Sequence, residues 1–139
     1  MPLGSITYHF TSIDELLVAA FTRHAQAVAD RFDERMRAAG DRVAAADVLV
    51  DHLTEDLLGS GRDLVLTVEL YVAAARNPEL RNLTQAWMLR SRQTLERHFD
   101  PVTARELDAL VEGLVLHSAL STDPMTAAQI RHAIHRHIH

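Results

Sequence analysis

The sequence predicts an all-α protein, and three observations support this prediction. Apolar residues recur at the three- and four-residue spacing of a helix over long segments. No segment shows the alternation of apolar and polar residues, bounded by hairpin turns, that is typical of strands. The few glycines and prolines lie mostly where the apolar periodicity breaks. With 139 residues, 47% of them hydrophobic, the chain is long enough for one folded domain with a core.

The first predicted helix spans residues 12–38. Ser12 and Glu15 have the spacing of a capping box at its start, and Gly40 stops it. The helix carries one continuous apolar stripe, so it is expected to face the core with one side. The stripe consists of Leu17, Phe21, Ala25, Val28 and Phe32.

The remaining helices are predicted between glycine- or proline-containing breaks. In the pairs Asn77-Pro78 and Asp100-Pro101, a capping residue precedes a proline at the first helical position. The segment 63–76 is apolar on nearly all sides and is therefore expected to be the central, buried helix. Leu116 and Leu120 give the segment 101–120 a second apolar face, which predicts packing against another copy of the chain. The predicted helices are 43–58, 63–76, 78–99, 101–120 and 126–139.

Composition and charge exclude several classes of function. All 14 basic residues are arginines, and the net charge of −5 argues against nonspecific nucleic-acid binding, which depends on neutralising phosphates. No apolar stretch approaches the roughly 20 residues of a membrane-spanning helix. No signal-peptide pattern is present. The absence of cysteine excludes disulfides and thiolate metal sites. We therefore expect a cytoplasmic protein with no membrane partner.

The beginning of the chain resembles one protein family. Its pattern is similar to the end of the helix-turn-helix, and the start of the long helix behind it, in TetR-type transcriptional regulators. The matching residues are Gly4-Ser5-Ile6 and Tyr8-His9-Phe10, followed by Ser12, Asp14, Glu15, Leu16 and Leu17. Weaker similarities are Glu69-Leu70-Tyr71, the junction Asn77–Arg81 and the run Leu107–Leu114.

The resemblance implies two parts. Residues 1–11 would be the end of a helix-turn-helix DNA-binding domain, a remnant of its recognition helix. Residues 12–139 would be a helical ligand-binding and dimerisation domain. The resemblance also implies the function of a ligand-responsive repressor. Such a repressor acts as a homodimer on a palindromic operator and leaves DNA when a small-molecule effector, here unidentified, binds. The residues expected to face DNA are Leu3, Gly4, Ser5, Thr7, Tyr8 and His9.

Three departures from the family pattern limit the DNA-binding prediction. The two helices that normally support a recognition helix are absent from the 139 residues. Ile13 stands where a lysine is common, and Leu3 stands where a polar or basic residue is often found. We therefore expect that these residues alone bind no operator specifically, and that the segment before Ser12 is loosely held. The alternative function is a small-molecule-sensing, dimerising helical module without DNA binding.

Five residues are candidates for ligand binding. A carboxylate in an apolar helix must be paired, protonated or facing a cavity, so Glu69 is either a pocket acid or half of a buried ion pair. His52 and His117 are pocket residues or hydrogen-bonded histidines of the core or the dimer seam. Trp87 and Met88 line a pocket or belong to the ordinary core.

The histidines near the end of the chain permit a metal site by spacing alone. Of His132, His135, His137 and His139, the first two and the last share one helical face. We favour a solvated polar tail, because a metal site needs rigidly held partner ligands.

The sequence predicts neither an enzyme nor a bound cofactor. It contains no phosphate-binding loop, no Gly-x-Ser-x-Gly elbow and no His-Glu-x-x-His motif. The only suggestive pair, Tyr8-His9, is explained by the family resemblance. A bundle enzyme or metal carrier using Glu69, His52 and His117 remains the rival from another class.

Overall fold

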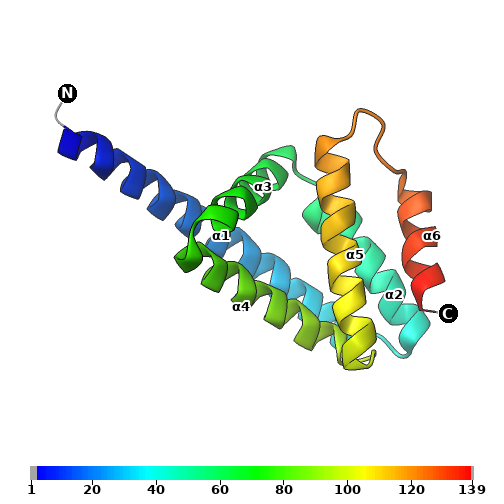
Figure 1. Ribbon diagram of the computed structural model, residues 1–139. Helices are drawn as coiled ribbons and strands as arrows, with labels where there is room; N and C mark the ends of the chain where they lie inside the picture. The colour runs from blue at the N-terminus through cyan, green and yellow to red at the C-terminus, as the bar shows by residue number, and fades with distance from the viewer. Residues whose placement is uncertain (1–2, 139) are drawn as a thin grey trace.

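The computed structural model describes the backbone of residues 3–138 and the side chains of residues 13–138. Within this part of the chain every regular element is a helix, which confirms the predicted fold class (Figure 1). The elements are α1 (Leu3–Ala38), α2 (Arg42–Asp51), the π-helix η1 (His52–Leu57), α3 (Gly61–Arg76), α4 (Pro78–Leu95), α5 (Pro101–Leu120) and α6 (Ala127–His137).

The long helix α1 is the axis on which the other helices are arranged. In Figure 1 its N-terminal turns extend beyond the rest of the molecule, and α3 and α4 lie along its middle. The helices α2, α5 and α6 gather near its C-terminal end. None of the helices over the described residues is both long enough and apolar enough to cross a membrane.

Two hydrophobic cores hold this arrangement together. The larger core joins the C-terminal part of α1 to α2, η1, α5 and α6, and its centre includes the fully buried Met36, Leu53 and Leu107. The smaller core joins the middle of α1 to α3 and α4. Its buried residues are Phe21, Leu70, Ala74 and Leu80. The predicted apolar stripe of α1 serves both cores, since Phe21 belongs to one and Phe32 to the other.

The helix starts follow the capping residues that the sequence offers. The Asp100 carboxylate accepts a hydrogen bond from the Thr103 amide at 2.8 Å, directly before Pro101. The side chain of Asn77 caps α4 in the same way, directly before Pro78. These caps confirm the predicted starts of α4 and α5.

The start of α1 differs from the prediction. The helix begins at Leu3, so Ser12 lies inside it and not at an N-cap. Continuation of the helix supplies backbone carbonyls to the amide groups that a cap would otherwise have to satisfy. The side chain of Ser12, which the sequence places in a capping box, lies outside the described residues.

The second predicted helix, 43–58, changes its geometry partway. Its last residues form η1, with the Leu58 amide donating to the Leu53 carbonyl at 2.9 Å, a five-residue separation. Gly59 follows directly, and a Cβ atom there would lie 1.9 Å from the Glu55 carbonyl oxygen. A glycine is therefore required where η1 ends.

The prediction that α3 is the central buried helix is wrong. Only Leu70 and Ala74 are buried in it, whereas Val65 and Val72 are 58% and 55% exposed. The helix packs on α1, α4 and α5 and leaves its remaining side to solvent, so an all-round apolar composition leaves apolar residues on the surface. The helix predicted over 78–99 also ends earlier, at Leu95, although Phe99 still reaches the larger core.

Candidate functional site

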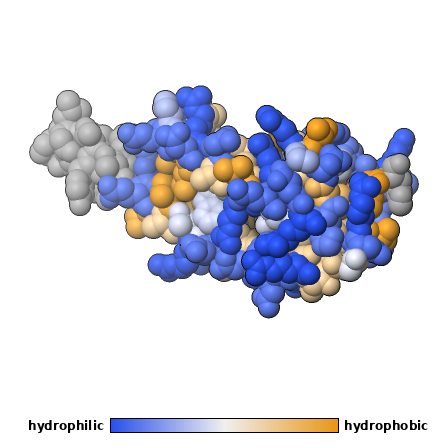
Figure 2. Space-filling model, turned by 90° about the horizontal axis from the view of Figure 1, so that it is seen from below, coloured by the Kyte–Doolittle hydropathy of each residue, from blue (hydrophilic) through white to orange (hydrophobic). Residues whose placement is uncertain are grey.

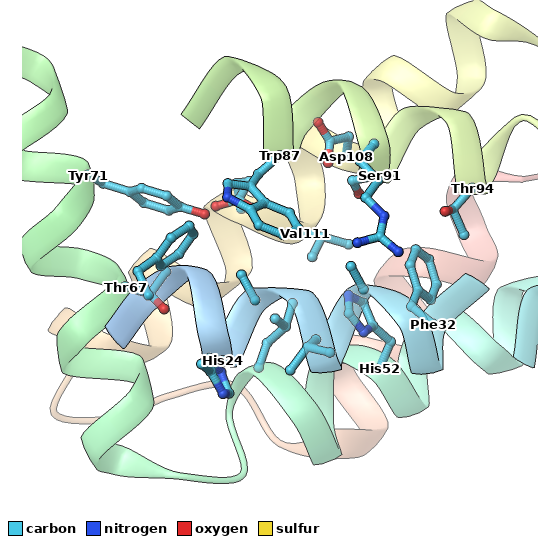
Figure 3. A pocket seen from close by; sticks show the side chains of 17 residues that line it. His24, Phe32, His52, Thr67, Tyr71, Trp87, Ser91, Thr94, Asp108 and Val111 are labelled. Carbon is cyan, nitrogen blue, oxygen red and sulfur yellow. The ribbon is translucent and has the colours of Figure 1, made fainter. Parts of the chain in front are cut away.

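A cavity of about 100 Å³ lies between the two cores (Figure 3). Side chains from α1, η1, α3, α4 and α5 form its wall. Phe21 and Trp87 reach it from the smaller core, and Phe32 and Val111 reach it from the larger one. The cavity therefore touches α1, α3, α4 and α5, and it touches the α2 side of the fold only through η1.

Aromatic side chains form one side of the cavity. Phe21 and Trp87 pack edge to face, with ring centroids 6.1 Å apart. Figure 3 shows the Tyr71 hydroxyl pointing from α3 toward the Trp87 indole on α4. The indole Nε1–H of Trp87 is buried and has no hydrogen-bond partner among the described residues. This part of the wall therefore offers flat apolar surfaces and an unused donor.

Two carboxylates on successive turns of α5 face the same space. Burial raises the pKa of Glu112 to about 7; a hydrogen bond from Tyr71 opposes this rise, and the nearby Asp108 adds to it. Burial also raises the pKa of Asp108, against the opposing effects of Ser91 and Arg92. The Arg92 Nε atom lies 3.4 Å from the Asp108 carboxylate, whereas Glu112 has no ion pair within residues 13–138 and the groups that act on it are Tyr71 and Asp108.

The arginine at the edge of the cavity is already paired. Arg90 forms an ion pair with Asp30 of α1. Its guanidinium carbon also lies 5.8 Å from the centre of the Trp87 ring. The cavity therefore presents carboxylates without presenting a free guanidinium group.

His52 connects the cavity to the C-terminal part of α1. Its ring stacks on Phe32 with centroids 4.0 Å apart, and burial lowers its pKa, so the imidazole is neutral near neutral pH. One turn further along η1, Asp56 pairs with Arg31 of α1 at 2.8 Å and with Arg35 at 3.9 Å. Interaction with His52 and with these arginines lowers the pKa of Asp56.

A second, more open cavity of about 290 Å³ adjoins the first. Tyr71 and Glu112 line both, so this pair forms the partition between them. Met88 and Leu116 line the second cavity only. A third hollow lies on the surface of α6 and includes His132.

Of the five predicted ligand-binding residues, three line a cavity and two do not. His52 and Trp87 line the first cavity, and Met88 lines the adjoining one. Glu69 is exposed and lines none of the three cavities, so its predicted burial is wrong. The reason is that its side of α3 faces solvent. His117 is also exposed and lines none of them, so its predicted places in the pocket and in the core are wrong, while its predicted place in the dimer seam stays a prediction.

Sequence reasoning missed the acidic residues that the structure brings to the cavity. Asp108 and Glu112 lie four residues apart, on one helical face among apolar neighbours. That spacing was a usable signal, because two acids on an apolar helix face require an explanation. The six residues predicted to face DNA, Leu3, Gly4, Ser5, Thr7, Tyr8 and His9, have side chains outside the described residues.

The C-terminal histidines have separate acidic partners. His135 Nε2 lies 2.7 Å from the Asp47 carboxylate, and His137 Nε2 lies 3.2 Å from that of Glu106. Across residues 13–138, no three histidine, aspartate or glutamate side chains gather as metal ligands would. His139 lies outside the described residues.

Comparisons with known proteins agree on one family. The family model described as tetracyclin repressor-like, C-terminal domain, matches residues 40–139. A solved structure titled as a transcriptional regulator, SCO7518 from Streptomyces coelicolor A3(2), is 52% identical, with a TM-score of 0.78. The match covers 99% of this chain and 79% of that one.

A second solved structure is the multidrug binding protein EbrR complexed with imidazole. It is 32% identical, with a TM-score of 0.76, over 99% of this chain and 76% of that one. A search of curated protein sequences finds no match.

Proposed function

Because the chain belongs to the TetR-like family of transcriptional regulators, we propose that it is a ligand-responsive repressor that binds a palindromic operator as a homodimer. Its effector is a small molecule that occupies the cavity between the two cores. The observation that carries this proposal is that α1 forms one wall of that cavity and continues to the residues that resemble a recognition helix.

The similar structure of EbrR supports a small-molecule effector. That protein is a multidrug binding protein, and its structure holds imidazole, a small heteroaromatic ring. The cavity of the present chain has a size and an aromatic wall suited to a ligand of that kind.

Coupling between effector and DNA would act through α1. The side chains of Phe21, Val28 and Phe32 all line the cavity, so a ligand that moves them moves the helix. Asp56 adds a charged link through its pairs with Arg31 and Arg35. An effector releases DNA only if it binds more tightly to the conformation with wrongly spaced recognition helices.

A homodimer would use the outward face of α5. The residues of this face are exposed or half-exposed, and they are apolar or small. They recur at helical spacing along α5. Leu120 is 77% exposed, and a side chain at Gly113 would meet nothing within 4 Å, so a second helix has room to approach closely. Seen from below, the molecule has scattered apolar groups on a mostly hydrophilic surface (Figure 2). The residues of this α5 face are Val102, Ala109, Gly113, Leu116 and Leu120.

The dimer is tested by the variant Ala109→Arg, which places a long cation in the centre of the α5 face. Sedimentation of the unmodified chain at micromolar concentration should give a dimer, and the variant should give a monomer. Ala27→Arg, on an exposed position of α1, is the matched control and should remain dimeric. A monomeric unmodified chain at that concentration would contradict the dimer.

The DNA-binding proposal is tested with the protein encoded by the whole reading frame. We expect salt-sensitive binding to a palindrome in the DNA upstream of its own gene, and weaker binding once the effector saturates the cavity. Equal operator affinity with and without effector would contradict ligand-responsive repression. Failure to bind any site there would favour the sensing module without DNA binding.

A further inference from the structure

We propose that the cavity between the two cores takes a small, flat, cationic amine, with the Glu112 carboxylate as its counter-ion, and discriminates against anions of the same shape. This inference rests on the proposed function, because it names the chemical class of the effector. The cavity surroundings support it in three respects, namely the balance of charge, the shape of the wall and the proton on Glu112.

The charge balance around the cavity leaves one carboxylate without a cation. Arg90 is paired with Asp30, and Arg92 lies within ion-pair distance of Asp108. The wall of this cavity therefore keeps no guanidinium group for an anionic ligand. Glu112 has no ion pair within residues 13–138, although it lines both inner cavities. Burying an unpaired carboxylate is unfavourable, and a ligand cation is the partner that would relieve it.

The shape of the wall limits the ligand to a small flat group. An engineered protein cavity of about 150 Å³ holds a benzene molecule, so a cavity of about 100 Å³ suits a single ring with local adjustment. Phe21 and Trp87 offer aromatic surface to such a ring. Tyr71 and Trp87 also attract a cation placed over their faces.

A ligand cation would replace a proton on Glu112. Burial holds the pKa of this carboxyl near 7, so the empty site carries a proton for much of the time at neutral pH. The arginines stay charged and burial keeps His52 neutral, so these groups do not change charge as the pH passes 7. Cation binding should therefore strengthen as the pH rises past 7. The other titratable or charged groups that line the two cavities are His24 on α1, His52 on η1, Tyr71 on α3, Arg81 and Arg90 on α4, and Asp108 on α5.

Three probes of one shape test the charge preference. Benzylamine is a cation, benzyl alcohol is neutral and benzoate is an anion, and all three carry one ring. Trp87 is the single tryptophan and lines the cavity, so its fluorescence reports binding at this site directly. At about pH 8, benzylamine should bind about tenfold more tightly than benzyl alcohol, which corresponds to one charge-assisted hydrogen bond. Benzoate should bind most weakly.

A pair of variants assigns the preference to one residue. Glu112→Gln keeps the shape and removes the charge, so benzylamine should lose about tenfold in affinity while benzyl alcohol changes little. Glu69→Gln makes the same chemical change on the exposed side of α3 and should leave both affinities unchanged. In the unmodified protein, lowering the pH from about 8 to about 6 should weaken benzylamine binding and leave benzyl alcohol unaffected.

The outcomes separate this inference from the proposed function. If no probe changes Trp87 fluorescence at millimolar concentration, the cavity is not the effector site, and both proposals fail. If all probes bind equally, or benzoate binds best, the cavity still binds ligand but the cation preference is overturned. The preference is also overturned if Glu112→Gln and Glu69→Gln bind benzylamine equally well.

Discussion

The larger and smaller cores differ in how completely their side chains fill the space between the helices. At the centre of the larger core, Met36, Leu53 and Leu107 are fully buried and line none of the three cavities. In the smaller core, Phe21 and Trp87 border the cavity directly. The difference indicates that the two regions have different roles. The larger core stabilises the fold, and the region beside the smaller core leaves room for a ligand.

Polar groups follow the same division. Three buried polar residues, His52, Thr94 and Asp108, line the cavity at the border between the cores; of the other two among the described residues, Thr84 lines the adjoining cavity and Asp56 pairs with Arg31. The centre of the larger core contains aliphatic side chains and methionine. Buried polar groups need partners, so a region that collects them is suited to binding a polar ligand.

The largest expected effect is the truncation of a leucine in the larger core. Leu107→Ala should reduce the free energy of unfolding by about 3 to 5 kcal/mol, because Leu107 is fully buried in well-packed surroundings. Leu80→Ala, in the smaller core, should cost about 2 kcal/mol, because fewer buried residues surround it. Urea denaturation measures both. Equal losses would contradict the difference between the cores.

The next effect is a pH-dependent gain in stability from removing a buried acid. The ordinary pKa of 4.5 for Glu112 rises to about 7 in the folded protein. Between these values the folded state holds a proton that the unfolded state releases, so the contribution of Glu112 to stability falls as the pH rises. Glu112→Gln should therefore match the unmodified protein below about pH 4.5 and exceed it by up to about 3 kcal/mol above about pH 7. Equal stability at both ends of this range would show that Glu112 is not desolvated.

The third effect is that of a larger side chain, which should differ between the larger core and the cavity. Ala104 is fully buried in the larger core, so Ala104→Leu should destabilise the fold by about 1 to 3 kcal/mol through overpacking. Ala25 lines the cavity, so Ala25→Leu should be accommodated with little loss of stability and should abolish probe binding. Thermal unfolding and Trp87 fluorescence provide the two readouts. A large loss of stability for Ala25→Leu would mean that the cavity is not usable space.

The smallest expected effect lies at the rim of the cavity. Asp30 is largely exposed, so Asp30→Asn should change stability by at most about 1 kcal/mol. The change frees Arg90 from its ion pair beside Trp87, and benzoate affinity should rise a few-fold as a result. Unchanged benzoate binding in this variant would show that the pairing of Arg90 does not help to exclude anions.

The comparison also explains what could be predicted from the sequence. The apolar stripe of α1 and the caps Asn77 and Asp100 are local signals, and the structure confirms them. Local signals do not show which side of a helix meets a neighbour. For that reason the sequence draws attention to Glu69 on α3, which faces solvent, and not to Glu112 on α5, which lines the cavity.

The site itself depends on contacts between distant parts of the chain. His52 and Trp87 are predictable as candidates because a histidine among apolar residues and a single tryptophan are unusual in this composition. The pairing of Tyr71 with Glu112 joins residues far apart in sequence, and no periodicity reveals it. The π-helical geometry of η1 is likewise invisible, because its residues have an ordinary helical pattern.

The most direct test of the account is a nuclear Overhauser measurement between benzylamine and the protein. The single indole Nε1–H of Trp87 gives one resolved resonance, which identifies the site without ambiguity. Contacts from the benzylamine ring protons to this indole and to the Val111 methyl groups are the predicted result, because both residues line the cavity between the two cores. Contacts confined to the surface hollow of α6, with the Trp87 resonance unmoved, would contradict the central claim that this cavity is the ligand site.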